Sequence, residues 1–164
     1  MRALVYGWSV GGVVLLCASA AFRLGLRGID GWAHATDPQR YAGLAWIAWM
    51  LVSAAWPGFH RQFAPRVAIR SAKLADEPLG PVALLGPLVA IGFVRATGKR
   101  RAIAVGLVTG IVAMSIGATF LPEPWRGLLD LGVAIAVASG VGSLLWFGAR
   151  TWLGRPPPVD PDWA

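Results

Sequence analysis

Charged residues are scarce in this chain of 164 residues, making up only 14% of it, while 56% of the residues are apolar. A soluble domain is typically about a quarter charged, so this chain lacks the polar side chains that would cover a globule of its size. The longest stretch between apolar runs, residues 59–78, is far too short to form an independent domain. The composition therefore excludes a soluble enzyme, a tethered catalytic domain and a DNA-binding protein of the usual kind.

Cysteine and histidine are almost absent as well. The one cysteine, Cys17, can form neither an internal disulfide nor a cysteine-based metal cluster. His34 and His60 are separated by the apolar run 41–58, so we expect them at opposite faces of a membrane, where they cannot share one haem or metal. Two aspartates flank His34 in sequence and would complete at most a weak surface metal site. We therefore predict no metal and no cofactor.

The middle of each long apolar run carries no charge. Proton pumps and ion-coupled carriers generally keep ionisable residues there, so this absence argues against both classes. The nearest exception is Asp130, in the first turns of the last run, where a helix dipole and Arg126 one turn earlier would stabilise it. Helix capping accounts for Asp130. The alternative is a ligand or ion pathway at the outer face, formed by Glu123, Arg126 and Asp130.

Long apolar runs are what the chain has instead. About 20 helical residues cross a hydrocarbon core, and lipid forces the backbone to satisfy its own hydrogen bonds, which favours helices. We predict an all-α fold, a polytopic membrane helical bundle. Its four spans are residues 3–22, 41–58, 102–121 and 128–149, and a shorter apolar run covers 79–94.

The chain divides into one transmembrane helical domain, residues 1–154, and a proline-rich tail, residues 155–164. The tail is expected to be extended and disordered, although it could dock on a partner. The first run resembles a cleavable signal peptide, but it is nearly long enough to span a membrane. We expect this first helix to be retained.

Basic residues give a topology. If residues 79–94 enter and leave on the same side, eleven basic residues share the face of both termini and four lie opposite. This agrees with the positive-inside rule and predicts cytoplasmic termini in a bacterial inner membrane. The short run suits re-entry, because Gly86-Pro87 at its centre interrupts a helix. The alternative is a kinked fifth span.

The segment 59–74 is the most amphipathic one outside the apolar runs, and it predicts an interfacial helix with its basic face on anionic lipid headgroups. A solvated loop is the alternative, because Pro65 interrupts the pattern. Membrane lipids are thus predicted partners, and nucleic acid is not. The predicted headgroup contacts are Arg61, Arg66, Arg70, Lys73, Lys99, Arg100 and Arg101.

Tryptophan and small residues are abundant. Trp46 and Trp49 lie three apart within a run and could flank a lipid, quinone or pigment, although ordinary packing is the commoner role. Small residues four apart let helices approach closely in lipid. The predicted packing residues are Gly7, Gly11, Gly106, Gly110, Ala138 and Gly142.

Two function hypotheses follow. The first is a non-catalytic subunit or assembly factor that packs against other chains of a larger membrane complex, because no nucleophile–base pair or phosphate-binding loop is present. The second is a small oligomeric transporter or channel whose pathway uses the broken helix at Gly86 and Pro87, since broken helices line binding sites in carriers.

Overall fold

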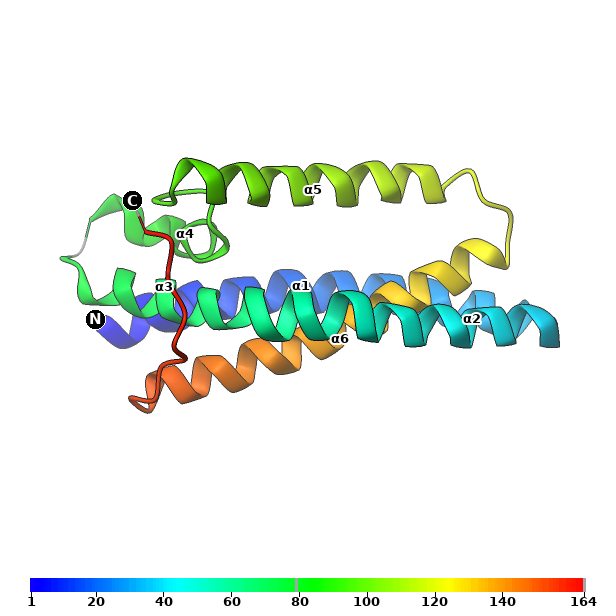
Figure 1. The fold of residues 1–164 in the computed structure, drawn as a ribbon, viewed down its shortest axis with the longest axis horizontal. Coiled ribbons are helices and arrows are strands. Elements are labelled where there is room, and N and C mark those ends of the chain that lie inside the picture. Colours follow the sequence, from blue (N-terminus) through cyan, green and yellow to red (C-terminus); the bar gives the residue numbers. More distant parts are fainter. Residues whose placement is uncertain (79, 164) are drawn as a thin grey trace.

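The computed structural model describes residues 1–78 and 80–163, and this part of the chain is helical (Figure 1). Four of its helices, Arg2–His34, Asp37–Asp76, Gly98–Ala118 and Trp125–Trp152, are long and apolar enough to cross a membrane. The prediction of an all-α fold with four long apolar helices is confirmed. The elements in order are α1 (Arg2–His34), α2 (Asp37–Met50), η1 (Leu51–Phe63), α3 (Ala64–Asp76), η2 (Pro81–Leu85), α4 (Gly86–Ile91), α5 (Gly98–Ala118) and α6 (Trp125–Trp152).

The second long helix joins α2, the π-helix η1 and α3 without a break over 40 residues. The prediction of a separate interfacial helix at 59–74 is therefore wrong. Pro65 does not interrupt this helix and lies where the π-helix η1 passes into α3. The apolar face of α3 is buried in the bundle, and this packing outweighs the basic face that suggested a membrane surface.

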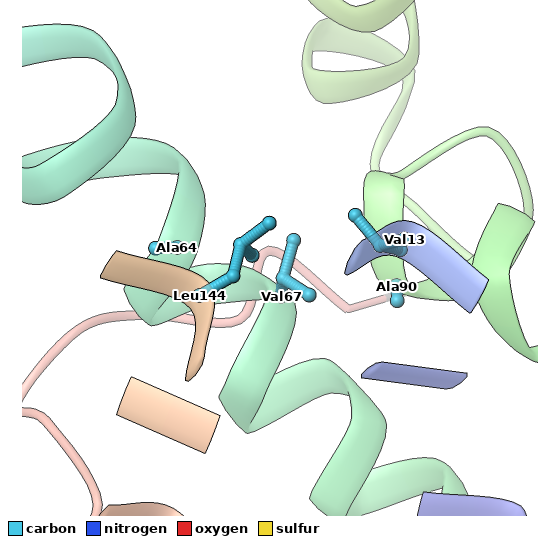
Figure 2. Packing of buried hydrophobic residues seen from close by; sticks show 5 residues of the cluster. All are labelled: Val13, Ala64, Val67, Ala90 and Leu144. Carbon is cyan, nitrogen blue, oxygen red and sulfur yellow. The ribbon is translucent and has the colours of Figure 1, made fainter. Parts of the chain in front are cut away.

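The core lies where α1, α3, α4 and α6 meet, and each contributes a fully buried aliphatic side chain. Figure 2 shows this cluster at close range, with side chains from the four helices converging. Close packing of these side chains adds van der Waals contact between the four helices. The cluster consists of Val13, Ala64, Val67, Ala90 and Leu144.

The helices α1 and α6 run antiparallel and approach each other closely at glycines (Figure 1). A Cβ atom placed on Gly31 would lie 2.6 Å from the Cα atom of Gly127, and one on Gly28 would lie 2.7 Å from the Cα atom of Leu131. No side chain fits at such a distance from backbone. These glycines therefore set the separation of the two helices.

The short apolar run forms the 3₁₀ helix η2 and the α-helix α4, which meet between Leu85 and Gly86 as the Gly-Pro break predicts. The chain turns away after α4 at Gly92, whose φ of 105° favours glycine. The segment begins near the end of α3 and leads to the start of α5 at the same end of the bundle (Figure 1). Residues 81–91 are too few to form a fifth long helix.

The helix α5 differs from the other long helices because it stands apart from them (Figure 1). Its described side chains are exposed, except for Arg100, Ala104 and Ala118. It begins and ends a few residues before the predicted span 102–121.

One end of the bundle collects most of the basic residues, and we call it the basic end. It is the end where α1 and α5 begin and where α3 and α6 finish (Figure 1). Eleven of the fifteen basic residues lie in loops at this end or in the halves of the helices nearer to it. The four at the opposite half are Arg23, Arg27, Arg40 and Arg126.

Candidate functional site: a buried arginine at the basic end

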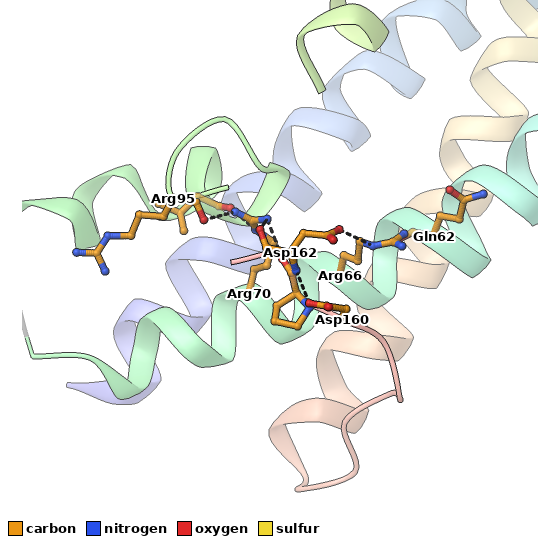
Figure 3. Close-up of polar contacts among 8 residues, drawn as sticks. Gln62, Arg66, Arg70, Arg95, Asp160 and Asp162 are labelled. Atoms are coloured by element: carbon orange, nitrogen blue, oxygen red, sulfur yellow. Dashed lines mark hydrogen bonds and ion pairs between the residues drawn. The ribbon is translucent and has the colours of Figure 1, made fainter. Parts of the chain in front are cut away.

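Arg70 of α3 is the most deeply buried charged residue of the described chain, with only 1% of its surface exposed. Its guanidinium donates hydrogen bonds to backbone carbonyl oxygens of residues 89–95 and of the C-terminal tail, two regions that are far apart in sequence. Figure 3 shows Arg70 between Arg95 and Asp162. The acceptors are Val89 (2.8 Å), Val94 (3.2 Å), Arg95 (2.9 Å), Pro161 (2.9 Å) and Asp162 (3.5 Å).

These bonds explain how a charge is accommodated among apolar helices. A buried guanidinium is costly unless its N–H groups are satisfied, and here Nε, Nη1 and Nη2 each have a carbonyl partner. The carbonyls come from α4, from the loop that follows it and from the C-terminal tail. Arg70 thus ties α4 and the loop after it to the C-terminal tail.

The C-terminal tail is ordered on this arginine, contrary to the prediction of disorder. The Asp162 carboxylate lies 3.3 Å from Arg66, and the Asp162 carbonyl accepts a hydrogen bond from the Thr97 N–H (3.2 Å). The Trp163 ring covers the guanidinium of Arg70 at 5.6 Å and the ammonium of Lys73 at 5.1 Å. Charge and cation–π contacts to α3 therefore replace the disorder expected from composition.

The predicted headgroup contacts fall into two groups. Arg61, Lys73, Lys99 and Arg101 are exposed. Arg66 and Arg100 are half-buried beside the tail, and Arg70 is enclosed. With the tail in place, carbonyl oxygens surround the Arg70 guanidinium, so Arg70 makes no outward contact in this arrangement.

Asp130 forms a second polar contact, at the opposite end of the bundle. Its carboxylate pairs with Arg27 of α1 at 3.0 Å and is mostly buried, instead of pairing with Arg126 on its own helix. Glu123 accepts a hydrogen bond from the Gly127 N–H (3.3 Å), so Glu123 supplies the cap expected of Asp130. The helix begins at Trp125, three residues earlier than predicted, which places Asp130 facing α1. Glu123 and Asp130 thus have separate partners, the Gly127 N–H and Arg27.

His60 lies within the long second helix and not beyond its end, because this helix continues past the apolar run 41–58 to Asp76. Its Nδ1 atom is 3.0 Å from the Ser143 hydroxyl, and its ring stacks on Trp56 with centroids 4.7 Å apart. His34, at the end of α1, contacts Asp30 instead. Within residues 1–78 and 80–163, no group of three potential metal ligands comes together.

The two tryptophans proposed to flank a flat ligand do different things. The Trp46 indole N–H donates to the Leu129 carbonyl (3.1 Å), and its ring packs on Gly132 of α6. Trp49 is 62% exposed on the outer surface of the bundle. The pair therefore encloses no common site, and Trp46 acts in packing α2 against α6.

Gly86 and Pro87 also pack against a helix. A Cβ atom on Gly86 would lie 2.3 Å from the Ser9 hydroxyl oxygen, and Pro87 closely faces Gly12 of α1. The predicted packing residues behave differently, since a Cβ atom would meet nothing within 4 Å at five of them, and Ala138 is exposed. These residues therefore make no close helix contact with the described part of the chain. The five are Gly7, Gly11, Gly106, Gly110 and Gly142.

The burial of Arg70 was not predicted, although the sequence around it carries a signal for it. Phe63, Val67, Arg70 and Leu74 follow the 4-3-4 spacing of one helix face, and this face is otherwise apolar. An arginine on such a face predicts a buried, hydrogen-bonded charge.

Comparison with known protein families, with curated proteins and with solved structures gave no match to this chain.

Proposed function

We propose that the chain is an integral protein of a bacterial inner membrane, with both termini and the basic end on the cytoplasmic side. The four long apolar helices support insertion. The gathering of eleven basic residues at the end that holds both termini supports this orientation. The α4 segment would then re-enter from the cytoplasmic face.

Within the membrane, the chain acts as a non-catalytic subunit that packs against other membrane chains of a larger complex. The exposed helix α5 is the observation that carries this proposal. Gly106 and Gly110 stand on one face of α5, where an added Cβ atom would meet no described atom of another element within 4 Å. Glycines four apart allow the closest helix approach in lipid, so this face suits a helix from another chain.

Transport through the Gly86-Pro87 break is the less favoured reading. Carriers use a broken helix to present free backbone groups to a substrate. Here Gly86 and Pro87 contact Ser9 and Gly12 at distances that leave no space for a solute between them. The break therefore serves the packing of α4 on α1.

Purification in mild detergent tests the subunit proposal. We expect unrelated membrane chains to co-purify in fixed stoichiometry, and we expect the variant Gly106→Leu/Gly110→Leu to lose them. Val108→Phe/Val112→Phe adds bulk to the opposite face of α5 and should retain the partners. A homo-oligomer that moves solute across liposomes, or retention of partners by both variants, would refute the proposal.

A further inference from the structure

An excess of positive charge surrounds the end of the C-terminal tail. Arg66 and Arg100 both lie within electrostatic range of the Asp162 carboxylate, and Arg100 also faces the guanidinium of Arg70 across Gly92. Lys73 adds a fourth cation beside Trp163. Asp162 is the one carboxylate paired with this group among the described residues, since Glu77 pairs with Arg95. The cluster therefore carries a net positive charge, which a second anion or an anion of higher charge would balance.

Two donors in this cluster lack an acceptor. The Nε atoms of Arg66 and Arg100 are buried and make no hydrogen bond with any described residue. The Arg66 Nε atom lies 3.3 Å from the Asp162 Oδ2 atom, but the contact has the geometry of an ion pair and not of a hydrogen bond. A buried N–H without an acceptor is costly. One planar carboxylate on a tethered chain does not satisfy both.

A phosphate group fits these donors better than a carboxylate does. Its oxygens point in tetrahedral directions, so several guanidinium groups can bind it at once from different sides. Arg66 comes from α3 and Arg100 from the first turn of α5, so the two approach from separate elements. Both lie at the basic end, which would face the anionic lipid of the inner leaflet.

We propose that Arg66, Arg70 and Arg100 form a binding site for a phosphate group, and that Asp162 of the tail occupies this site as an internal competitor. The proposal rests on membrane insertion with the basic end at the headgroups, but not on the partner subunit. A phosphatidic acid headgroup and a soluble phosphate share the required chemistry.

The tail is held in a way that permits exchange. Main-chain carbonyls of Pro161 and Asp162 accept from Arg70, and phosphate oxygens can replace them as acceptors. A short tether gives a tail an effective concentration of about millimolar order, which a leaflet rich in anionic lipid can match. Release of the tail would also free the Thr97 N–H from the Asp162 carbonyl, which gives a local reporter.

The test uses the full chain in neutral detergent, with dioleoyl phosphatidic acid as the probe. Native mass spectrometry measures lipid affinity, and hydrogen exchange measures protection of the Thr97 amide. We expect phosphatidic acid to bind and to speed exchange at Thr97 several-fold. Binding that leaves this exchange unchanged or slower would overturn the competition between lipid and tail.

Matched variants separate a built site from general charge. Arg66→Gln/Arg100→Gln should weaken lipid binding about tenfold, because it removes charge-assisted hydrogen bonds. Arg150→Gln/Arg155→Gln removes the same charge from exposed positions at the basic end that are not predicted headgroup contacts, and it should have little effect. Equal loss in the two double variants would overturn the site.

A single conservative variant keeps the test decisive if the double variant does not fold. Asp162→Asn removes the internal competitor and should tighten lipid binding about three- to tenfold. Asp76→Asn removes a carboxylate that pairs with Arg2 at the same end and serves as its control. Equal affinity of the two variants would overturn the proposal.

Inorganic phosphate distinguishes the source of the ligand. If millimolar phosphate alone speeds Thr97 exchange and does so more readily in Asp162→Asn, the site stands and takes a soluble phosphate. If only the lipid does so, the site stands and takes a headgroup. Neither result depends on co-purifying chains, so failure here is distinct from failure of the subunit proposal.

Discussion

The helices α5 and α6 have similar apolar composition but different surroundings. α6 lies in the bundle, where α1, α2 and α3 contact it, whereas α5 stands apart with most of its described side chains exposed. The difference lies in specific partners. α6 meets glycines of α1 at backbone distance, and it accepts hydrogen bonds from Tyr6 at the Gly148 carbonyl (2.7 Å) and from Trp46 at the Leu129 carbonyl.

Apolar composition thus makes a helix suited to a membrane without choosing its neighbours. Lipid tails are as apolar as leucine, so helices in a bilayer associate through close fit and polar contacts and not through the hydrophobic effect. α6 has both of these features within the chain, and α5 has glycines that meet nothing within 4 Å. We therefore expect substitutions in the anchored body to cost stability, and matched substitutions on α5 to cost little.

The largest effect is expected for Arg70→Met. It would leave five carbonyl contacts without their donor and would release the tail and the loop after α4. We expect a loss of about 3 kcal/mol or more, or failure to fold, because several buried acceptors become unsatisfied together. Thermal unfolding in detergent, followed by loss of monodispersity, measures it. Arg101→Met on α5 is the control, and equal destabilisation by both would contradict the enclosed role of Arg70.

Gly31→Ala is expected to have the next largest effect. The added methyl group would lie 2.6 Å from the Cα atom of Gly127, so α1 and α6 must separate. We expect a cost of about 1–3 kcal/mol in unfolding free energy, typical of overpacked cores. Gly110→Ala on α5 meets nothing within 4 Å and should be neutral or slightly stabilising. Similar thermal midpoints for the two variants would show that the glycine contact does not hold the helices together.

Much of this architecture follows from the sequence. The long apolar runs, which carry no charge in their middle, predict the long helices. Gly86-Pro87 predicts the break at which η2 and α4 meet. The sequence misleads where a local pattern competes with tertiary contact. Phe63, Val67 and Leu74 indicated an amphipathic surface helix, but the bundle buries that face, and Arg70 with it.

The candidate site was less predictable than the fold, for a physical reason. The acceptors of Arg70 are main-chain carbonyls, which every residue carries and which no side-chain pattern reveals. The proline and charge of the tail predict an extended, disordered chain. Its last residues, Asp162 and Trp163, nevertheless contact Arg66 and Arg70 of α3. Only the three-dimensional arrangement brings positions 70, 100 and 162 together.

Asp130→Asn sharpens the comparison at the other end of the bundle. It removes the charge that pairs with Arg27 but keeps the shape of the side chain. We expect a cost of about 1 kcal/mol, because the carboxylate is mostly buried while Arg27 is half exposed and therefore partly screened. Thermal unfolding measures it, and the double variant Arg27→Gln/Asp130→Asn should cost little more than either single one. Additive costs would mean that the two residues act separately.

The smallest effect is expected for Trp46→Phe, which keeps an aromatic ring against Gly132 but removes the hydrogen bond to the Leu129 carbonyl. We expect a loss of about 0.5–1 kcal/mol, because one neutral hydrogen bond contributes about this much and the acceptor is only partly buried. Trp49→Phe lies one turn away on the exposed surface and should change the thermal midpoint less. The difference between the two variants isolates the polar contact from the aromatic surface, since both changes remove the same atoms. If Trp49→Phe were the more destabilising, outward contact with lipid or another chain would outweigh the contact that joins α2 to α6.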